Sequence, residues 1–136
     1  MDSNFDFLKN EWFKFYDPAI EAEKNVYTAP RTCVFYSRYT MERIVRWLYD
    51  HDSFLKKPYQ ATLAAMMHEQ TFKDNLAPGL FNRINYIRKL GNIAVHDSGK
   101  INTTESLTSL RHLFAFISWF VKSYSDTPPG DLNFNE

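Results

Sequence analysis

The ten residues from Arg88 to Asp97, RKLGNIAVHD, contain the side chains best suited to chemistry. Arg88, Asn92 and His96 recur every four residues, so a helix would place them along one face. An arginine can bind a phosphate, an imidazole can transfer a proton near neutral pH, and an asparagine can orient either group. Such a set could cleave RNA by helping a 2′-hydroxyl attack the adjacent phosphate.

The same three residues also have a structural interpretation, which we take as the expectation while the catalytic one stays open. His96 falls in the last turn of the expected helix, where an imidazole can bond free carbonyls and interact favourably with the helix dipole. Asn92 can bridge to a neighbouring helix, and Arg88 can pair with a carboxylate. Gly91 and Ala94, in the same stretch, are small enough to let another helix approach closely.

A second candidate is a basic side on the segment from about residue 28 to residue 50. It is made of four arginines, Arg31, Arg38, Arg43 and Arg46. Arg38, Glu42 and Arg46 are spaced by four residues, which predicts ion pairs along a helix surface. The interpretation we favour is a solvated charged face. The alternative is a contact surface for an acidic partner such as a nucleic acid.

Apolar residues recur at steps of three and four along most of the chain, which predicts a helical scaffold. The first pattern, over residues 5–26, is interrupted by Pro18. We expect a break or a kink there, giving one bent helix or two helices in series with Asp17 as the cap of the second. Further helices are expected over residues 28–50 and, more briefly, over residues 59–70.

The remaining helices carry the candidate site and the end of the fold. Pro78 is expected to start a central helix whose buried seam includes Ile84, Ile87 and Gly91. Asn102 and Glu105 form a capping-box pattern before a strongly apolar helix that reaches residue 124. No strand pattern competes. The predicted fold is therefore all-α, an irregular bundle of about five or six helices.

Composition limits the classes of function. The 136 residues predict one domain, and the 16 basic and 16 acidic residues cancel, which disfavours non-specific nucleic-acid binding by the whole surface. Cys33, the one cysteine, excludes an internal disulfide and fits a buried thiol in a reducing cytoplasm. Metal-ligand spacing, a phosphate-binding glycine loop and a long apolar run are all missing from the sequence, so we expect no metal, no cofactor and no membrane span.

Three stretches together carry a family resemblance. They are NFDFLKNEWFKFYDPAIEAEKNVYTAPRTCVFYSRYTMERIVRWLYDHD, YQATLAAMMHEQTF and IRKLGNIAVHDSGKINTTESLTSLRHLFAFISWFVKSY. They resemble the helical domain at the extreme N-terminus of many type I restriction endonuclease R subunits. The similarity spans about residues 4–125, and GNxAVH, here Gly91 to His96, is its most specific short motif. The resemblance implies one domain of a larger polypeptide, in which a nuclease or an ATP-driven DNA translocase follows.

The chain also looks distantly like the helical HEPN superfamily, many of whose members are ribonucleases with an Arg-Asn-x-x-x-His motif. Asn92 and His96 match that spacing, but Gly91 stands where the motif has arginine, and Arg88 comes one turn earlier. This departure favours a non-catalytic domain. The alternative is a HEPN-type ribonuclease that uses Arg88, Asn92 and His96 across a symmetric dimer.

These resemblances set the functional expectations. Residues 1–125 are expected to form a HEPN-like accessory domain, and residues 126–136, DTPPGDLNFNE, a linker or tail that leads to a downstream module. The expected role is assembly, regulation or DNA-complex contacts in a cytoplasmic restriction-modification system. The expected partners are other modules or subunits of that complex, a second copy in a homodimer, and DNA through the parent complex.

Overall fold

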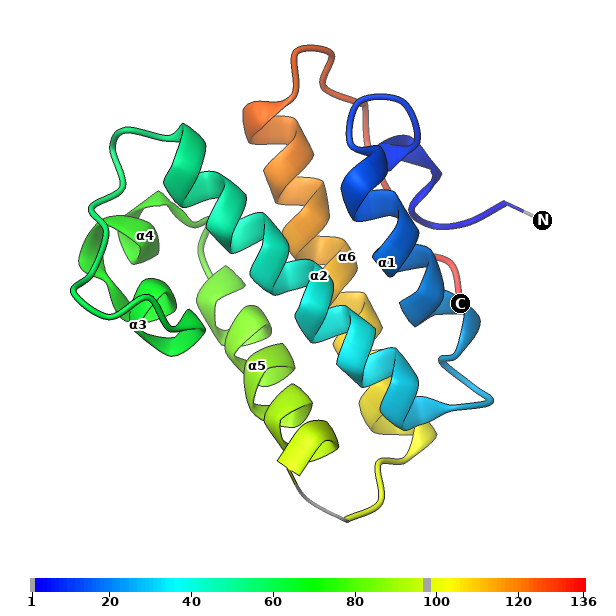
Figure 1. The fold of residues 1–136 in the computed structure, drawn as a ribbon. Coiled ribbons are helices and arrows are strands. Elements are labelled where there is room, and N and C mark those ends of the chain that lie inside the picture. Colours follow the sequence, from blue (N-terminus) through cyan, green and yellow to red (C-terminus); the bar gives the residue numbers. More distant parts are fainter. Residues whose placement is uncertain (1, 97–98) are drawn as a thin grey trace.

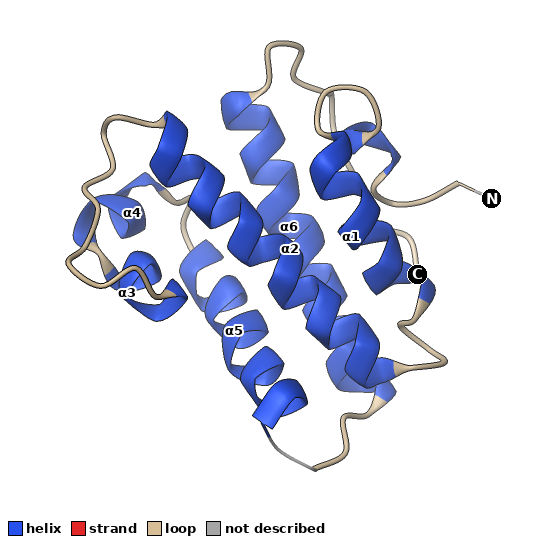
Figure 2. Ribbon diagram, in the orientation of Figure 1, coloured by secondary structure: helices blue, strands red, loops and turns tan. Residues whose placement is uncertain are grey.

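The computed structural model describes residues 2–96 and 99–136, and it confirms the all-α prediction (Figure 1). Within these residues there are six α-helices, one short 3-10 helix and no strand (Figure 2). In chain order the helices are η1 (Asp6–Leu8), α1 (Phe13–Lys24), α2 (Pro30–His51), α3 (Leu63–His68), α4 (Gln70–Asn75), α5 (Leu80–His96) and α6 (Thr103–Tyr124).

Helix α2 is the central element of the bundle, because it packs against α1, α5 and α6 (Figure 1). It begins with Pro30 at its first position, where the fixed φ of proline suits a helix and its missing N–H costs nothing. The apolar stripe predicted for this helix is fully buried and comprises Val34, Met41, Ile44, Val45 and Leu48. In Figure 1, α1 and α5 lie on opposite sides of α2.

Helix α6 is buried on more than one side, as its broad apolar face predicts. The predicted capping box is present: Glu105 N donates to Asn102 Oδ1 at 2.8 Å, and Asn102 N donates to Glu105 Oε1 at 3.0 Å. Phe120 contacts Trp12 and Trp47, with ring centres 4.8 and 5.2 Å apart. These rings join α6 to α2 and to the start of α1.

Pro18 and Pro78 do not have the structural roles that were predicted from the sequence. Helix α1 runs continuously through Pro18, so the expected second helix capped by Asp17 is wrong. A proline there removes one backbone hydrogen bond, and the burial of Phe15 and Ala19 on either side of it keeps the helix packed in the core. The chain changes direction earlier, between η1 and α1.

Helix α5 begins at Leu80, two residues after the proline expected to start it. Leu80 N donates to Ala77 O at 3.1 Å, and Gly79 between them has a φ of +81°. Proline followed by a glycine of positive φ is the signature of a type II turn, so Pro78 belongs to the turn and not to the helix.

The helix expected over residues 59–70 is shorter in the structure, where α3 covers Leu63–His68, and a second short helix, α4, follows at Gln70–Asn75. Glu69 separates them with an extended backbone, and its carboxylate accepts a hydrogen bond from Thr71 N at 2.8 Å, which caps α4. Leu63, Met66 and Met67 face the core, as predicted.

Residues 126–136 contain no helix, yet they return along the N-terminal segment. Phe134 packs on Phe114 with ring centres 5.4 Å apart. Asn4 Nδ2 donates to Asn135 O at 2.6 Å, and Asn135 N donates to Asn4 Oδ1 at 2.8 Å. The two ends of the chain therefore lie side by side (Figure 1).

Candidate functional site

The polar stripe predicted on residues 88–96 lies on α5. Arg88 is half-buried, and its guanidinium donates from Nε and Nη2 to Asn85 Oδ1 at 3.3 and 3.0 Å. Asn92 is half-buried, and His96 is exposed as the last residue of the helix. Arg88 is thus engaged by an amide one turn back on its own helix, where the sequence suggested a carboxylate.

At Gly91, α5 packs closely against Arg38 of α2, which confirms the predicted role of this small residue. A Cβ placed on Gly91 would lie 2.3 Å from Arg38 Cδ and 2.7 Å from Arg38 Cβ. No real Cβ tolerates such distances, so the crossing of the two helices requires glycine here. The aliphatic part of Arg38 fills the space that a side chain at position 91 would take.

Arg31 performs the carbonyl-binding role that the sequence suggested for His96. From the first turn of α2, its guanidinium donates to the carbonyl oxygens of Ile93, at 3.4 Å, and of Ala94 and Gly99. The last carbonyls of a helix lack partners within the helix and carry its negative end, so a cation there is favourable. Arg31 thereby fixes the end of α5 that carries His96.

The four arginines of the predicted contact surface fall into two groups with different surroundings. Arg31 and Arg38 turn toward α5, while Arg43 and Arg46 are exposed. The predicted ion pairs are present: Glu42 accepts from Arg38 Nη1 at 3.2 Å and from Arg46 Nη2 at 2.9 Å. Arg43 bonds the hydroxyl of Tyr39 at 3.0 Å instead of a carboxylate.

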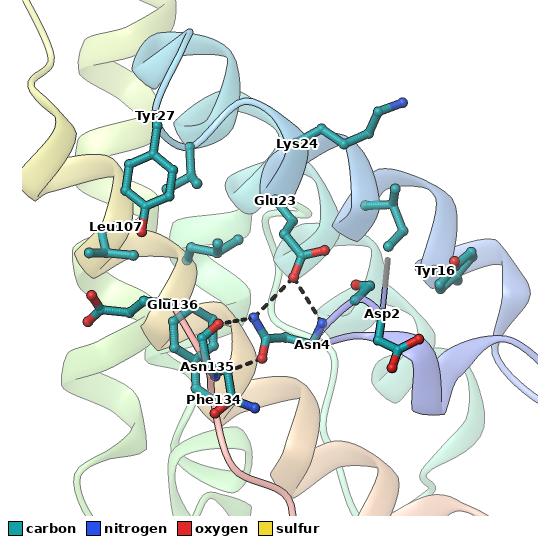
Figure 3. Close-up of a pocket in the computed structure, with 14 residues that line it drawn as sticks. Asp2, Asn4, Tyr16, Glu23, Lys24, Tyr27, Leu107, Phe134, Asn135 and Glu136 are labelled. Carbon is teal, nitrogen blue, oxygen red and sulfur yellow. Dashed lines mark hydrogen bonds between the residues drawn. The ribbon is translucent and has the colours of Figure 1, made fainter.

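A cleft of about 420 Å³ is formed by the N-terminal segment, α1, the start of α6 and the C-terminal residues. Figure 3 shows the residues that line it. Glu23 Oε2 accepts from Asn4 N at 2.9 Å and from Asn4 Nδ2 at 3.1 Å, so this carboxylate anchors the N-terminal segment. Apolar walls come from Val26, Leu107 and neighbouring residues. None of the residues selected from the sequence lines this cleft.

Two further hollows lie between α1 and α2. Arg43 and Arg46 of the predicted contact surface line them, together with residues that the sequence did not single out. They include Lys14 and Trp47, together with His51. No short motif links these positions, because Lys14 is more than 30 residues from the others in the chain. Only the packing of α1 along α2 brings them together.

The thiol of Cys33 is buried in the core. Burial raises the pKa of the Cys33 thiol to about 12, although a hydrogen bond with Ser37 lowers it in part. Thiolate is the reactive form of cysteine, so this thiol is inert at neutral pH. The expectation of a buried thiol is confirmed.

Two absences hold for the described residues. Within residues 2–96 and 99–136, no three histidine, cysteine or acidic side chains are grouped so as to hold a metal ion. In the same part of the chain, no helix combines the length and the apolar character needed to cross a membrane.

Comparisons with known proteins add no assignment. No protein-family model matches the chain, and neither a curated protein nor a solved structure shows a significant match. The functional argument therefore depends on the residues and their geometry.

Proposed function

We propose that this chain is a non-catalytic helical interaction domain, and that it serves as an accessory domain of a type I restriction R subunit or a close relative. The observation that carries the proposal is a pair of exposed apolar side chains beside the Gly91 crossing. Phe35 on α2 is 44% exposed, and Val95 on α5 is 53% exposed. Exposed apolar groups with polar neighbours are typical of protein interfaces.

Helical geometry places these two side chains near each other. Phe35 lies between Arg31 and Arg38 along α2, and both arginines contact α5. Val95 lies one turn beyond Gly91 along α5. We call the surface made of Phe35, Val95 and the half-buried Arg88 and Asn92 the α2–α5 face.

The disposition of the polar stripe supports a binding role over a catalytic one. Arg88 is held by Asn85, and His96 stands exposed at the end of the helix. General acid–base chemistry needs the proton-transferring group within hydrogen-bond reach of the reacting atoms, while a second group holds the phosphate. A polar stripe beside exposed apolar side chains suits the rim and centre of an interface better.

The test is complex formation with purified modification and specificity subunits of a type I restriction-modification system, measured by size-exclusion chromatography with light scattering. We expect a complex that Phe35→Ser combined with Val95→Ser abolishes. Tyr59→Ser is the matched control, since Tyr59 is fully exposed in the loop before α3 and lies outside the α2–α5 face. Light scattering of the chain alone tests whether the same face joins two copies.

Two results would overturn this proposal. One is the absence of any complex with those subunits. The other is RNA cleavage by the purified domain that His96→Ala removes, which would support the HEPN-type ribonuclease alternative with Arg88, Asn92 and His96 as the catalytic residues.

A further inference from the structure

The hollow between the first half of α1 and the second half of α2 carries an excess of positive charge. It has a volume of about 310 Å³, and we call it the α1–α2 hollow. Its lining consists of Lys14, Phe15, Arg43, Arg46, Trp47, Asp50 and His51. Three cations thus face one carboxylate in a chain whose total charge is zero. This excess gives the hollow a local preference for anions that the surface as a whole lacks.

The pairing of these charges leaves two cations without an anionic partner. Arg46 is paired with Glu42, and Asp50 lies 3.9 Å from Lys57. Among the described residues, no carboxylate lies within ion-pair distance of Lys14 or Arg43. The ammonium group of Lys14 lies over the ring of Phe15, 5.4 Å from its centre.

The hydrogen-bond donors around Arg43 are suited to a phosphate. Arg43 Nη1 donates to Tyr39 Oη at 3.0 Å, so the tyrosine keeps its own O–H to donate elsewhere. The other N–H groups of the guanidinium remain for a ligand, and arginine binds phosphate through two parallel hydrogen bonds. Lys14 adds a point charge from the opposite helix.

An aromatic pair closes the other end of the α1–α2 hollow. His51 stacks on Trp47 with ring centres 4.1 Å apart and planes 12° apart, and its Nδ1 bonds Trp47 O at 2.8 Å. His51 is exposed, so its ring is accessible to solvent at the edge of the hollow. Stacking of bases on such rings, combined with cations for the phosphates, is how proteins hold single-stranded nucleic acids.

A second hollow of about 600 Å³ continues along the same two helices and shares Lys14 and Arg43 with the first. Tyr36 and Tyr39 line it, and so do the carboxylates Asp17 and Glu21, of which Glu21 is paired with Lys24. Negative charge therefore increases in this direction. The positive charge is confined to a short stretch, which fits one or two phosphates and not the many phosphates of a duplex.

We propose that the α1–α2 hollow binds the phosphate of a nucleotide, free or within a single strand, through Lys14 and Arg43, with the base stacked at His51. The site adjoins the α2–α5 face, since Tyr39, which accepts from Arg43, stacks on Phe35 with ring centres 6.4 Å apart. The inference does not depend on the function proposed above.

The test is a fluorescence-anisotropy titration of the full chain with a short labelled oligothymidylate at low salt. Thymidine monophosphate and inorganic phosphate serve as competitors. We expect saturable binding that Lys14→Gln combined with Arg43→Gln weakens about tenfold, with a smaller dependence on salt. Lys89→Gln combined with Lys122→Gln removes the same charge from exposed positions on α5 and α6, and should change the affinity less than about twofold.

Arg43→Lys should give an intermediate affinity, because lysine keeps the charge but loses the paired donors. Competition by thymidine monophosphate would show that a free nucleotide suffices, whereas binding of the oligonucleotide alone would assign the site to a strand. If a variant is unstable, amide chemical shifts of the unmodified chain give the answer. Thymidine monophosphate should then move signals of Lys14, Arg43 and His51 selectively.

Four outcomes would overturn the inference. They are the absence of saturable binding, equal weakening in the control pair, preference for a duplex, and competition by inorganic phosphate as strong as by the nucleotide. The last outcome would mean that the hollow selects an anion without regard to the base.

Discussion

The side chain of Arg38 lies directly on Gly91, where α2 crosses α5. A Cβ at position 91 would come within 2.7 Å of Arg38 Cβ, an atom that cannot move without its backbone. Glycine inside a helix costs about 0.5–1 kcal/mol relative to alanine. At this position the cost is offset by the close packing that it allows between two helices.

Gly91→Ala should therefore destabilise the fold by about 1–3 kcal/mol, even though alanine favours the helix. Urea unfolding followed by circular dichroism measures the change. Gly130→Ala is the control, since a Cβ there has nothing within 4 Å. Combining Gly91→Ala with Arg38→Ala should restore part of the lost unfolding free energy, because the Cγ and Cδ atoms of Arg38 no longer crowd the new Cβ. A Gly91→Ala variant as stable as the parent chain would show that the helices can separate at no cost.

Arg31→Ala should loosen the end of α5, because three carbonyl oxygens lose their guanidinium donor. We expect a loss of about 1–2 kcal/mol in unfolding free energy, since a charged donor is removed at a partly exposed site. Hydrogen exchange should become faster in the last turn of α5 before it does so elsewhere. Arg43→Ala, on the same helix, should change stability by less than about 0.5 kcal/mol. Equal losses of stability in Arg31→Ala and Arg43→Ala would show that Arg31 does not stabilise the end of α5 through these carbonyl oxygens.

His112 should make the fold sensitive to mild acid. Arg83 Nη1 lies 3.2 Å from His112 Nδ1, and burial first, then the positive charge of Arg83, lowers the pKa of this imidazole below its ordinary value of 6.5. The unfolded chain thus binds a proton more readily than the folded one. This contribution to stability is complete above the unfolded pKa and is lost as the pH falls through 6.5 toward the folded pKa.

Melting temperatures measured between pH 7.5 and pH 5 test this linkage, the two pH values being set about one unit or more on either side of an ordinary histidine pKa. His112→Gln should reduce the loss of stability over that interval, because glutamine can still accept from Arg83 and does not titrate. A variant with an unchanged pH dependence would show that other groups control the acid response.

Tyr124→Phe should remove the hydroxyl through which α6 is hydrogen-bonded to Asp52, after α2, and to Asn75 of α4. Tyr124 Oη donates to Asp52 Oδ2 at 2.6 Å and accepts from Asn75 Nδ2 at 2.6 Å. Loss of this oxygen leaves a carboxylate and an amide without their partner, which should cost about 1–2 kcal/mol in thermal or urea unfolding. Tyr59→Phe, at a fully exposed ring, should leave stability unchanged. Comparable losses in both variants would exclude a specific role for the hydroxyl.

Local sequence signals predicted most of the fold correctly. The capping pair Asn102 and Glu105 and the proline at position 30 act within a few residues of themselves, so they set helix ends without knowledge of the rest of the structure. Pro18 misled the prediction because the burial of Phe15 and Ala19 outweighs one missing hydrogen bond. Pro78 misled the prediction because the glycine that follows it has a positive φ, so the pair forms a turn and not the first turn of the helix.

The candidate sites were harder to predict from the sequence, because they depend on contacts between helices that are far apart in the chain. The spacing of Arg31 and Arg38 along their own helix gives no sign that both turn toward α5. Lys14 and Arg43 likewise share a hollow only because α1 and α2 pack together. The sequence shows which side chains the helices carry, but it does not show toward which neighbouring helix each of them turns.

The pairing of Asn4 with Asn135 makes the molecule almost cyclic in topology. A short glycine linker across the two ends would turn it into a ring without disturbing α1 or α6. New ends could then be opened at the exposed Tyr59 and Gln60, in the loop between α2 and α3. Such a circular permutant would keep every helix pair of the bundle, and it would allow a fused probe to be attached at a site far from the pairing of Asn4 with Asn135.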